Sequence, residues 1–448
     1  SDKFVEEPRP ASYRGQRERT AFQVDRARYD EILLSHAQSI GCDVEQGVGV
    51  AKVRIRGDRV ESLVLSNGKE VVADHYIDAS GNVAVLRKAM GVKISEPAAL
   101  RNIAIWDYWE NAEWAKSIGI GGTMVQVMSI ANGWIWFIPL SPTRTSIGFI
   151  CPADYYKNSG KSTEQLYLEA LPKDENILTL IENAQREGKL QATKDWSFLS
   201  ERMTGENWLL VGETAGFADP ILAAGLTLTH CSAREAAYIV VDMYRGSHDS
   251  AWLKKHYEET QKQRILQHIR FADFWYAANG QFEDLFDHTA KIAKEAGITL
   301  TPEKAFQWLG TGGFADDIQG QAGLGGFDMN GIKQITNLFL DGDLDWMLNR
   351  YNTFKLDIQG ATEEAIPVFK DGKITSHRCF FRDGRKLPIV GFFGLIYEVL
   401  RKHSDIVSIL QELVIQLRKH QIKADIGLAV RYAIQPLEVM VTEGWVNG

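Results

Sequence analysis

Apolar residues recur at helical spacing in some parts of the chain and at alternate positions in others, and each change predicts a new element. The first hundred residues also contain Asn67-Gly68, a dipeptide that favours two-residue hairpin turns. The pattern here predicts a helix over 25–40, a strand over 43–53, a hairpin over 59–73 and a strand over 75–78. This order of elements indicates part of a nucleotide-binding domain.

A second strand-to-helix unit lies at 208–226, with the sequence WLLVGETAGFADPILAAGL. Its first four residues, 208–211, form an apolar run short enough for a buried parallel strand, and the run breaks at Gly212-Glu213. Asp219-Pro220 follows, and a helical segment begins near Gly225. Free backbone N–H groups at such a turn can hold an anion or a cofactor, although an ordinary turn of an α/β protein has the same sequence features.

Residues 100–200, between these two units, have the alternation of a β-rich domain. Strands are expected at 101–109, 123–129, 134–140 and 145–150, and a helix at 162–170. In the third strand, Trp134, Trp136 and Ile138 fall on one face, and Pro139 ends the strand or marks a sheet edge. Two indoles on one face form a rigid apolar wall suited to a planar ring, but an aromatic-rich core strand gives the same pattern.

The second half of the chain predicts long helices over 226–244 and 252–282. Residues 309–327 hold seven glycines, which suits a linker or a mobile lid. From about Ala365 the pattern predicts two strands that meet at Asp371-Gly372, helices over 392–402 and 405–420, and a strand over 437–446. A hairpin with helices and a closing strand suggests a small winged-helix-like module. Its basic residues form either a solvated face or a contact for an acidic partner: Lys373, Arg378, Arg382, Arg385 and Lys386.

Composition narrows the class of protein. The chain has 448 residues, of which 45% are hydrophobic and 24% charged, enough for two or three globular domains. A net charge of −8 argues against a nucleic-acid-binding surface. No apolar run reaches the roughly 18 to 20 residues of a membrane span, and the polar start predicts no signal peptide. The four cysteines lie far apart, which favours reduced, buried thiols in a cytoplasmic protein, and no residue set has the spacing of a metal site.

Several phrases of the sequence resemble FAD-dependent aromatic hydroxylases and halogenases. They are FQVDRARYDEILLSHAQSIGCDV, YIDASGNVAVLRKAMGV and the stretch at 208–226 with its G-E and D-P pairs. A further phrase, GWIWFIP, meets all four positions of the W-x-W-x-I-P motif of the flavin-dependent halogenases. The resemblance covers roughly residues 20–280.

The resemblance implies an FAD site built from matched positions. It places Arg26 on the flavin nucleotide, Val50 beside the adenine, and Asp78 to Gly81 at the closing edge of the pocket. The second flavin motif supplies the remaining positions: Gly212, Glu213, Asp219, Pro220, Gly225 and Leu226. Glu213 stands where the family has an aspartate, so a longer carboxylate would meet the ribityl chain. From the residues alone, Arg26 is equally an exposed residue at a helix start that pairs with Asp30.

The family also implies a reaction. Reduced FAD from a partner flavin reductase reacts with oxygen, and a halide, chloride or bromide, becomes hypohalous acid. This acid travels through a tunnel to an electron-rich aromatic carbon. By resemblance, Trp134 and Trp136 line the route and keep the substrate away from the flavin. The halide is expected at the backbone N–H groups of Ala224 and Gly225, because a helix start attracts an anion without a cationic side chain.

Three features depart from the family pattern. No G-x-G-x-x-G unit precedes residue 20, so we expect the sequence to begin about 60 to 80 residues into a longer protein. The family's catalytic lysine falls in the same missing stretch, and the context of Lys3 does not match it. Leu222 stands where tryptophan halogenases have a glutamate, which favours phenols, pyrroles or aromatics tethered to an acyl or peptidyl carrier protein.

The combined prediction is a mixed α/β (α+β) fold with an FAD-binding Rossmann-like domain, a β-sheet substrate domain and a C-terminal helical module. The expected parts are a partial FAD-binding domain at 1–95, the substrate domain at 96–200, more of the FAD-binding domain at 201–245, a helical region at 246–360 and the C-terminal module at 361–448. The predicted function is halogenation of an electron-rich aromatic compound in natural-product biosynthesis. Two alternatives stay open, an FAD-dependent aromatic monooxygenase or oxidoreductase and a non-catalytic binding protein with an incomplete flavin site.

Overall fold

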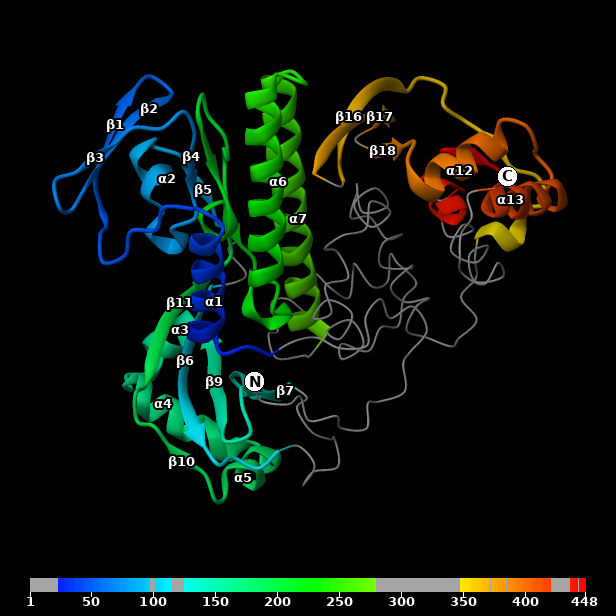
Figure 1. Cartoon of the computed structure of the whole chain (residues 1–448). Helices are drawn as coiled ribbons and strands as arrows, with labels where there is room; N and C mark the ends of the chain where they lie inside the picture. The colour runs from blue at the N-terminus through cyan, green and yellow to red at the C-terminus, as the bar shows by residue number, and fades with distance from the viewer. Residues whose placement is uncertain are drawn as a thin grey trace. The chain divides into compact units, whose positions relative to one another are not determined.

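The computed structural model describes residues 23–96, 101–114, 125–278, 347–370, 372–383, 385–419, 436–441 and 443–448. The chain divides into two compact units, whose elements are labelled in Figure 1. Of the described residues, 23–223 and 268–278 belong to the first unit, and 224–267 together with those from 347 onward belong to the second. Each unit combines helices with strands, which confirms the mixed α/β prediction.

Two parallel strands lie at the centre of the predicted nucleotide-binding part. β4 (Tyr76–Asp78) pairs with β13 (Trp208–Leu210) residue by residue, from Tyr76 opposite Trp208 to Asp78 opposite Leu210. All three residues of β13 are fully buried, as expected for a parallel strand covered on both faces. Both strands were predicted from the sequence, and both predictions are confirmed.

The predicted hairpin is also confirmed. β2 (Arg59–Leu65) and β3 (Glu70–Val71) pair antiparallel across Asn67-Gly68, where Gly68 has a φ of +86°. The predicted strand over 43–53 is wrong in its first half, because β1 begins at Val50 and ends at Arg56. Gly47 has a φ of +72°, which departs from the extended backbone of a regular strand just before β1 begins.

The predicted N-terminal helix exists as α1 (Arg26–Ser39), and the Asp25 carboxylate caps its first turn. None of its residues is buried, and Ile32 on the predicted apolar side is 53% exposed. A short helix, α2 (Val85–Ala89), follows β4. The remaining strands of this part form a separate three-stranded sheet of β14 (Gly216–Phe217), β12 (Phe198–Ser200) and β5 (Ile94–Ser95).

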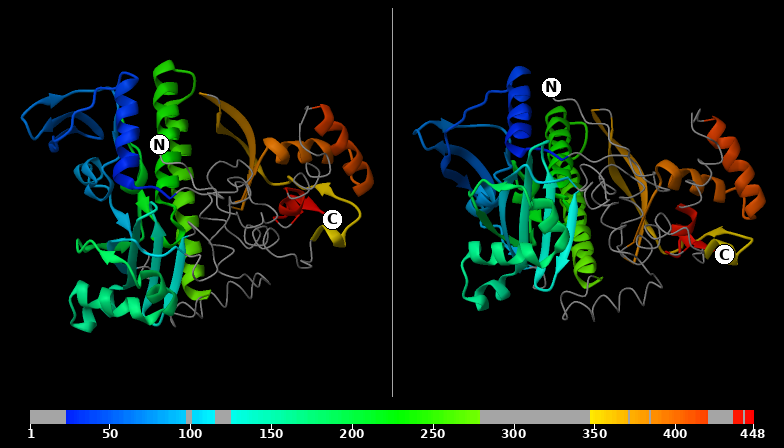
Figure 2. Two further views of the ribbon diagram at one scale, coloured as in Figure 1. Left: turned by 60° about the horizontal axis from the view of Figure 1, so that its bottom comes forward. Right: turned by 90° about the horizontal axis from the view of Figure 1, so that it is seen from below.

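The β-rich part is a six-stranded antiparallel sheet, drawn from further directions in Figure 2. Its path runs β10 (Gln185–Arg186), β6 (Arg101–Glu110), β9 (Arg144–Pro152), β8 (Gly133–Pro139) and β7 (Gln126–Ile130), and β11 (Gln191–Trp196) also pairs with β6. The four predicted strands are confirmed, although the first residues of the second lie outside the described residues. The helix predicted at 162–170 is α4 (Thr163–Ala170), whereas α3 (Ala153–Ser159) and α5 (Glu175–Ile181) were not predicted.

The two faces of this sheet have different roles. Alternate residues on β8 and β9, such as Ile135, Phe137 and Phe149, are fully buried in a core with α4 and α5. The other residues on β8, including Trp134 and Trp136, therefore point to the opposite face. This second face carries the predicted chemistry.

The second unit begins with α6 (Gly225–Arg245) and includes α7 (Ser250–Ala278) up to residue 267. Residues 268–278 of α7 belong to the first unit. Both predicted helices are confirmed over the described residues. Glu235 on α6 and Arg264 on α7 form an almost completely buried ion pair, with 2.8 Å between Oε1 and Nη2. Gln261 also donates to Glu235, so this carboxylate has the several partners that a buried charge needs. Within the described ranges, no helix is long and apolar enough to cross a bilayer.

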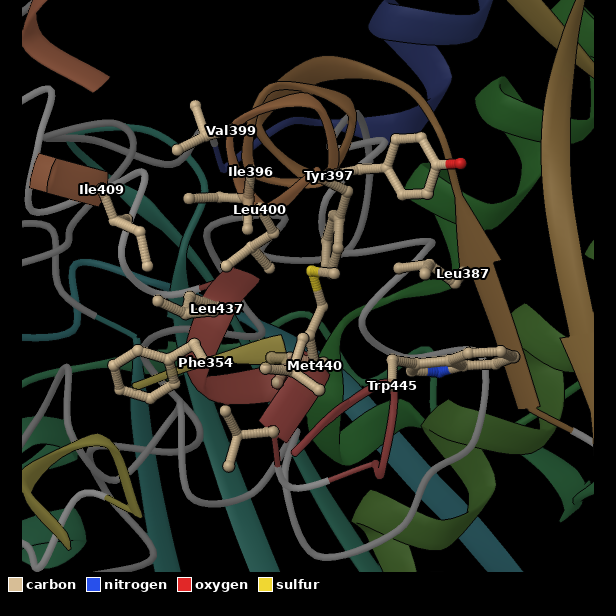
Figure 3. Packing of buried hydrophobic residues seen from close by; sticks show 14 of the residues in the cluster. Phe354, Leu387, Ile396, Tyr397, Val399, Leu400, Ile409, Leu437, Met440 and Trp445 are labelled. Carbon is tan, nitrogen blue, oxygen red and sulfur yellow. The ribbon is translucent and has the colours of Figure 1, made fainter. Parts of the chain in front are cut away.

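The C-terminal module contains a three-stranded sheet of β16 (Thr362–Lys370), β17 (Lys373–Arg382) and β18 (Arg385–Pro388), followed by α12 (Gly391–Leu400) and α13 (Ile406–Lys419). The predicted hairpin and both predicted helices are confirmed. Figure 3 shows the core of the module, where α12 and α13 meet Phe354, Leu437 and Met440. The winged-helix-like arrangement stays a prediction.

The strand predicted over 437–446 is wrong, because residues 436–441 are helical. Leu437, Met440 and Val441 are buried at the spacing of a helix face. Gly444 then adopts a φ of +75°, and the N–H of Trp445 bonds to the carbonyl of Met440, which ends the helix. Of the described residues from 436 onward, only β19 (Val446–Asn447) forms a strand, and it pairs with β15 (Lys355–Leu356).

Most of the basic residues predicted to meet an acidic partner have partners within the second unit. Arg378 forms two hydrogen bonds with Glu363, the shorter of 2.6 Å, and Arg382 bonds to Asp357. Lys386 Nζ lies 3.7 Å from a carboxylate oxygen of Glu259. These positive charges are therefore largely neutralised inside the unit.

Two isoleucines on α13 provide a matched test of the C-terminal core. Ile409 is fully buried, and Ile415 is 56% exposed on the same helix. We expect Ile409→Ala to lower the free energy of unfolding of this module by about 2–5 kcal/mol, because it removes buried methyl groups and leaves a cavity. Ile415→Ala should change it by less than about 0.5 kcal/mol. Urea unfolding followed by circular dichroism measures both, and equal effects would contradict this packing.

Candidate functional site

Asp78 ends β4 and organises the turn that follows it. Its side chain is only 4% exposed, and both oxygens accept hydrogen bonds. Oδ1 accepts from the backbone N–H and the hydroxyl of Ser80, and Oδ2 accepts from the N–H of Leu86 at 2.7 Å and of Arg87 at 3.3 Å. The carboxylate therefore fixes the turn and the start of α2, which leaves little capacity for a ligand.

Gly81 and Gly212 form two glycine turns at the same edge of the parallel strands. Their φ angles are +59° and +57°, so both positions favour glycine, as was predicted for Gly81. The hydroxyl of Thr214 donates to the carbonyl of Gly81 at 3.3 Å and links the two turns. A Cβ added at Gly81 would lie 3.8 Å from Oε2 of Glu213, so that carboxylate lies over the first turn.

The Glu213 carboxylate has a different environment from Asp78. It is half-buried and makes no hydrogen bond with any residue in the part of the chain that the structure describes. Burial raises its pKa, and the positive charge of Arg26 opposes this. A half-buried carboxylate without a hydrogen-bond donor suits a ligand that brings one, such as a sugar-like hydroxyl. On this observation the residues fit the ribityl chain of a flavin.

Arg26 begins α1 and pairs with Asp30 one turn later. Its Nε and Nη2 donate to the two carboxylate oxygens at 3.1 and 3.0 Å, as the alternative interpretation predicted. These hydrogen bonds raise the pKa of Arg26, and the more distant charge of Glu213 adds to the effect. The Arg26 side chain is 61% exposed. Val50, predicted beside the adenine, is the first residue of β1 and is half-buried.

The second flavin motif ends in a tight turn. Asp219 is 3% exposed, and its Oδ1 accepts from the N–H of Ile221 at 2.8 Å, so this carboxylate also stabilises backbone. Pro220 begins the short 3₁₀ helix η5 (Pro220–Leu222). Ala224 is the N-cap residue of α6 and has no side-chain capping hydrogen bond. α6 begins at Gly225, followed by Leu226, and its first backbone N–H groups receive no hydrogen-bond acceptor from the side chain of the N-cap residue. A halide at the predicted position would need such N–H groups.

The two tryptophans of the motif lie together on β8. The ring centroids of Trp134 and Trp136 are 5.9 Å apart, and the ring of Trp106, on β6, lies 6.3 Å from that of Trp136. Trp134 is 3% exposed and Trp136 is half-buried. The predicted aromatic face is thus confirmed, and a third indole extends it.

Trp136 is held by two residues of β9 that sequence reasoning missed. Gly148 is its cross-strand partner, and a Cβ added there would lie 2.1 to 2.5 Å from the indole, so the ring rests on bare backbone. The indole N–H donates to Oγ of Ser146 at 3.1 Å. A ring seated on glycine and fixed by one hydrogen bond has a defined orientation. The phrase TSIGFI contains both residues, but the register that places them under Trp136 cannot be read from the sequence.

Several predicted features remain outside the described residues, namely Lys3, Gly119 to Gly122 and the glycine-rich segment 309–327. All four cysteines are described and free, but Cys42 is exposed, so the prediction of buried thiols is wrong for that residue. In the described ranges, no cluster of three or more histidine, cysteine, aspartate or glutamate side chains could hold a metal ion.

Comparisons with known proteins identify a family and several relatives of this chain. A family model described as tryptophan halogenase matches residues 1–302. The 1H-pyrrole-2-carbonyl-[peptidyl-carrier protein] chlorinase of Pseudomonas fluorescens is 27% identical over 265 residues, which cover 58% of this chain and 59% of the relative. The tryptophan 2-halogenase of Chondromyces crocatus is 28% identical over 289 residues, 61% of this chain and 54% of that protein. The chain therefore spans less than two thirds of the length of either relative.

Among solved structures, that of CmlS, a flavin-dependent halogenase, has the same fold. It aligns with 95% of this chain and 78% of its own length, at a TM-score of 0.71 and 18% sequence identity. The structure of the flavin-dependent brominase Bmp2 aligns with 67% of this chain and 73% of its own, at a TM-score of 0.56 and 20% identity. At these identities the likeness extends to the fold alone.

The seat of Trp136 can be tested by adding one methyl group. We expect Gly148→Ala to lower the free energy of unfolding by about 1–3 kcal/mol, because the indole must move away from the new Cβ. The cost should largely disappear in a Trp136→Ala background, where no ring opposes the methyl group. Gly49→Ala is the control, since a Cβ there meets nothing within 4 Å. Equal costs with and without Trp136 would show that the contact does not govern this position.

The raised pKa of Glu213 predicts a pH dependence of stability. The folded state binds this proton more tightly than the unfolded state, so the contribution of Glu213 is greatest at low pH and is lost as pH rises through its raised pKa. We expect the melting temperature of Glu213→Gln, relative to the unsubstituted protein, to improve between about pH 4 and pH 7.

Glu363→Gln provides a control of opposite sign, because the hydrogen bond from Arg378 lowers the pKa of Glu363. Its relative melting temperature should fall over the same pH range. Thermal unfolding of both variants at several pH values measures the two slopes. Parallel slopes would contradict the assignment for Glu213.

Proposed function

Because this chain belongs to the tryptophan halogenase family, we propose that it is a flavin-dependent halogenase. It uses reduced FAD, oxygen and chloride or bromide to halogenate an electron-rich aromatic compound in natural-product biosynthesis. The observation that carries the proposal is the seated Trp136 of the W-x-W-x-I-P strand, in one compact unit with the two glycine turns that fit a flavin.

The flavin site is proposed on residues of the first unit. Glu213 would accept a hydrogen bond from a ribityl hydroxyl, and Arg26 would contribute positive charge beside the nucleotide. Gly81 and Gly212 let the backbone approach the ligand closely, and Asp78 and Asp219 hold the two turns in shape. When bound, reduced FAD supplies, with oxygen, the oxidising power that converts halide into hypohalous acid.

The halide is proposed at the N–H groups of Ala224 and Gly225. A helix of 21 residues begins there, and the partial positive charge of a helix start favours an anion. Trp134, Trp136 and the indole of Trp106 form an apolar wall that a planar aromatic ring can pass or contact. The lysine that the family uses at the reacting carbon is not assigned.

The proposed substrate is a phenol, a pyrrole or a related aromatic, free or tethered to a carrier protein. One relative is named as acting on a pyrrole-2-carbonyl group bound to a peptidyl-carrier protein, and it supports the tethered form. A separate flavin reductase is the proposed source of reduced FAD. We also propose a cytoplasmic location, because none of the four cysteines is paired.

Halogenation can be tested with the protein made from its complete reading frame. Reduced FAD, oxygen and bromide are supplied with phenols, pyrroles and indoles, both free and carrier-bound, and the products are analysed by mass spectrometry. We expect a bromine isotope doublet that requires bromide, and a loss of at least tenfold in brominated product for Trp136→Ala. The Ile415→Ala variant, altered at an exposed site of the C-terminal module, is the matched control and should keep its activity.

The other outcomes distinguish the alternatives. A hydroxylated product that forms without halide would favour an aromatic monooxygenase. Failure of the protein to bind FAD would favour a non-catalytic binding protein. Oxidation of reduced flavin by oxygen, with release of hydrogen peroxide and no altered substrate across the whole panel, would count against the proposed substrate class.

A further inference from the structure

Strand β9 presents three functional positions on one face. Arg144, Ser146 and Gly148 are two residues apart, so they point to the same side of the sheet as Trp136. Ser146 and Gly148 hold the indole of Trp136, as described above. Arg144 instead reaches out of the sheet to the beginning of α1.

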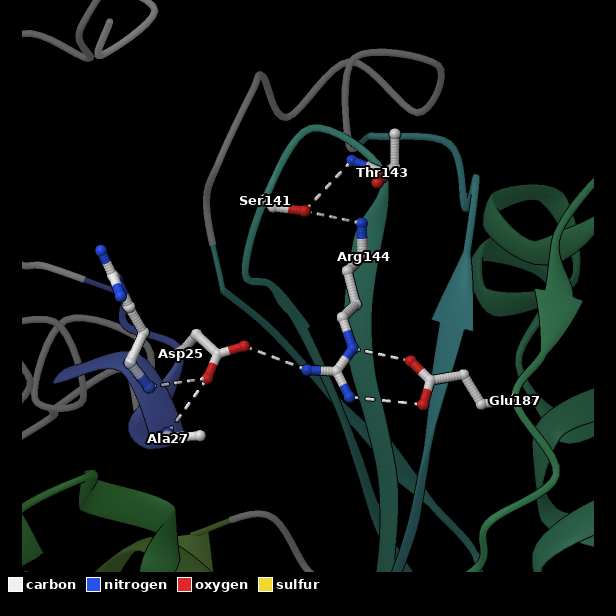
Figure 4. A network of polar contacts seen from close by, with 7 residues as sticks. Asp25, Ala27, Ser141, Thr143, Arg144 and Glu187 are labelled. Atoms are coloured by element: carbon white, nitrogen blue, oxygen red, sulfur yellow. Dashed lines mark hydrogen bonds and ion pairs between the residues drawn. The ribbon is translucent and has the colours of Figure 1, made fainter. Parts of the chain in front are cut away.

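The guanidinium of Arg144 lies between two carboxylates, as Figure 4 shows. Nη1 donates to Oδ2 of Asp25 at 3.0 Å, while Nε and Nη2 donate to the two oxygens of Glu187 at 2.7 and 3.3 Å. Its Cζ also lies 4.0 Å from the ring centroid of Tyr108, which supports the guanidinium from one side. An exposed ion pair between two flexible side chains contributes little to stability. The Arg144 side chain is only 30% exposed, and it contacts Asp25, Glu187 and Tyr108.

Asp25 has two functions at this position. Its Oδ1 accepts hydrogen bonds from the N–H groups of Ala27 and Arg28 and so caps α1. Its Oδ2 accepts the hydrogen bond from Arg144. The first turn of α1 is therefore tied directly to the sheet that carries the tryptophans, across 119 positions of sequence.

The same turn of α1 carries the cation assigned to the flavin. Arg26 follows Asp25 directly, and it is close enough to Glu213 for their charges to influence each other. One short turn thus carries both Asp25, which is bonded to the sheet of Trp136, and Arg26, whose charge acts on Glu213. Its position determines where Arg26 lies relative to Glu213.

We propose that Arg144 is a positioning residue for flavin binding, which holds the first turn of α1 through Asp25 and thereby places Arg26 beside the flavin nucleotide. This inference rests on the proposed function, because it assigns Arg26 to a bound flavin. Arg144 does not touch the flavin itself. Loss of the Arg144 guanidinium should lower the fraction of molecules in which this turn is correctly placed. The apparent dissociation constant for FAD equals the intrinsic constant divided by that fraction, so it should rise.

The test uses substitutions that separate the tether from the helix cap. Asp25→Asn keeps the capping oxygen, since asparagine and aspartate are equally good N-caps, but removes the charge that meets Arg144. Arg144→Met keeps the length of the side chain and removes the guanidinium. Glu187→Gln is the matched control, because it weakens the other carboxylate contact of Arg144 without altering Asp25.

The measurements are FAD affinity, from the quenching of flavin fluorescence, and the melting temperature of the same samples. We expect Asp25→Asn and Arg144→Met each to raise the dissociation constant about three- to tenfold. The dissociation constant of the double variant should lie within about twofold of the higher of the two single-variant values, because both substitutions remove the same tether. Arg144→Lys should recover part of the affinity, and Glu187→Gln should stay within about twofold of the unsubstituted protein.

The outcomes separate this inference from the proposed function. If the unsubstituted protein binds no FAD, the proposed function fails and the inference fails with it. If it binds FAD and both single variants bind equally well, only the positioning role of Arg144 is overturned. A lower melting temperature with unchanged FAD affinity would likewise overturn it, because it would indicate a purely structural ion pair.

Discussion

The parallel pairing of β4 with β13 is the constraint on which the proposed flavin site depends. Carboxyl ends of parallel strands meet at one edge of a sheet, so the turns that follow Asp78 and Leu210 must lie next to each other. Thr214 and Gly81 are 133 residues apart in sequence, yet the Thr214 hydroxyl bonds to the Gly81 carbonyl and links the two turns. The full burial of β13 fixes this pairing, because any shift would expose Trp208 or its neighbours to water.

The six-stranded sheet adds a second constraint, the alternation of its two faces. The face with Ile135 and Phe137 stabilises the β-rich part against its helices, and the opposite face carries Trp134 and Trp136. Strand β9 contributes residues to both faces of the sheet. Ile147 and Phe149 are part of the core, while Arg144, Ser146 and Gly148 hold functional elements on the other face. One strand thus connects the stability of the sheet to the geometry of the site.

The sequence is sufficient to predict most helices and strands, because apolar residues recur in them at a regular spacing. It failed where a single residue or a distant contact decided the outcome. Gly47 departs from the extended backbone of a strand just before β1 begins, and the helix at 436–441 was mistaken for a strand because consecutive apolar residues suit either period. Arg26 and Asp30 could be paired from their spacing alone. The contact of Arg144 with Asp25, and the seat of Trp136 on Gly148, depend on strand register and on tertiary packing, which local patterns do not encode.

The acidic residues of the flavin motifs show why contacts must be counted before a role is assigned. Asp78, Glu213 and Asp219 all stand at positions that the resemblance assigns to the FAD site, although Glu213 replaces the family's aspartate. In the structure Asp78 accepts hydrogen bonds at both oxygens and Asp219 holds the N–H of Ile221, so both stabilise backbone. Glu213 accepts none from a described residue, and burial raises its pKa. A carboxylate kept half-buried without a donor costs stability unless a ligand supplies one, so Glu213 is the member of this set that best supports the proposed flavin contact.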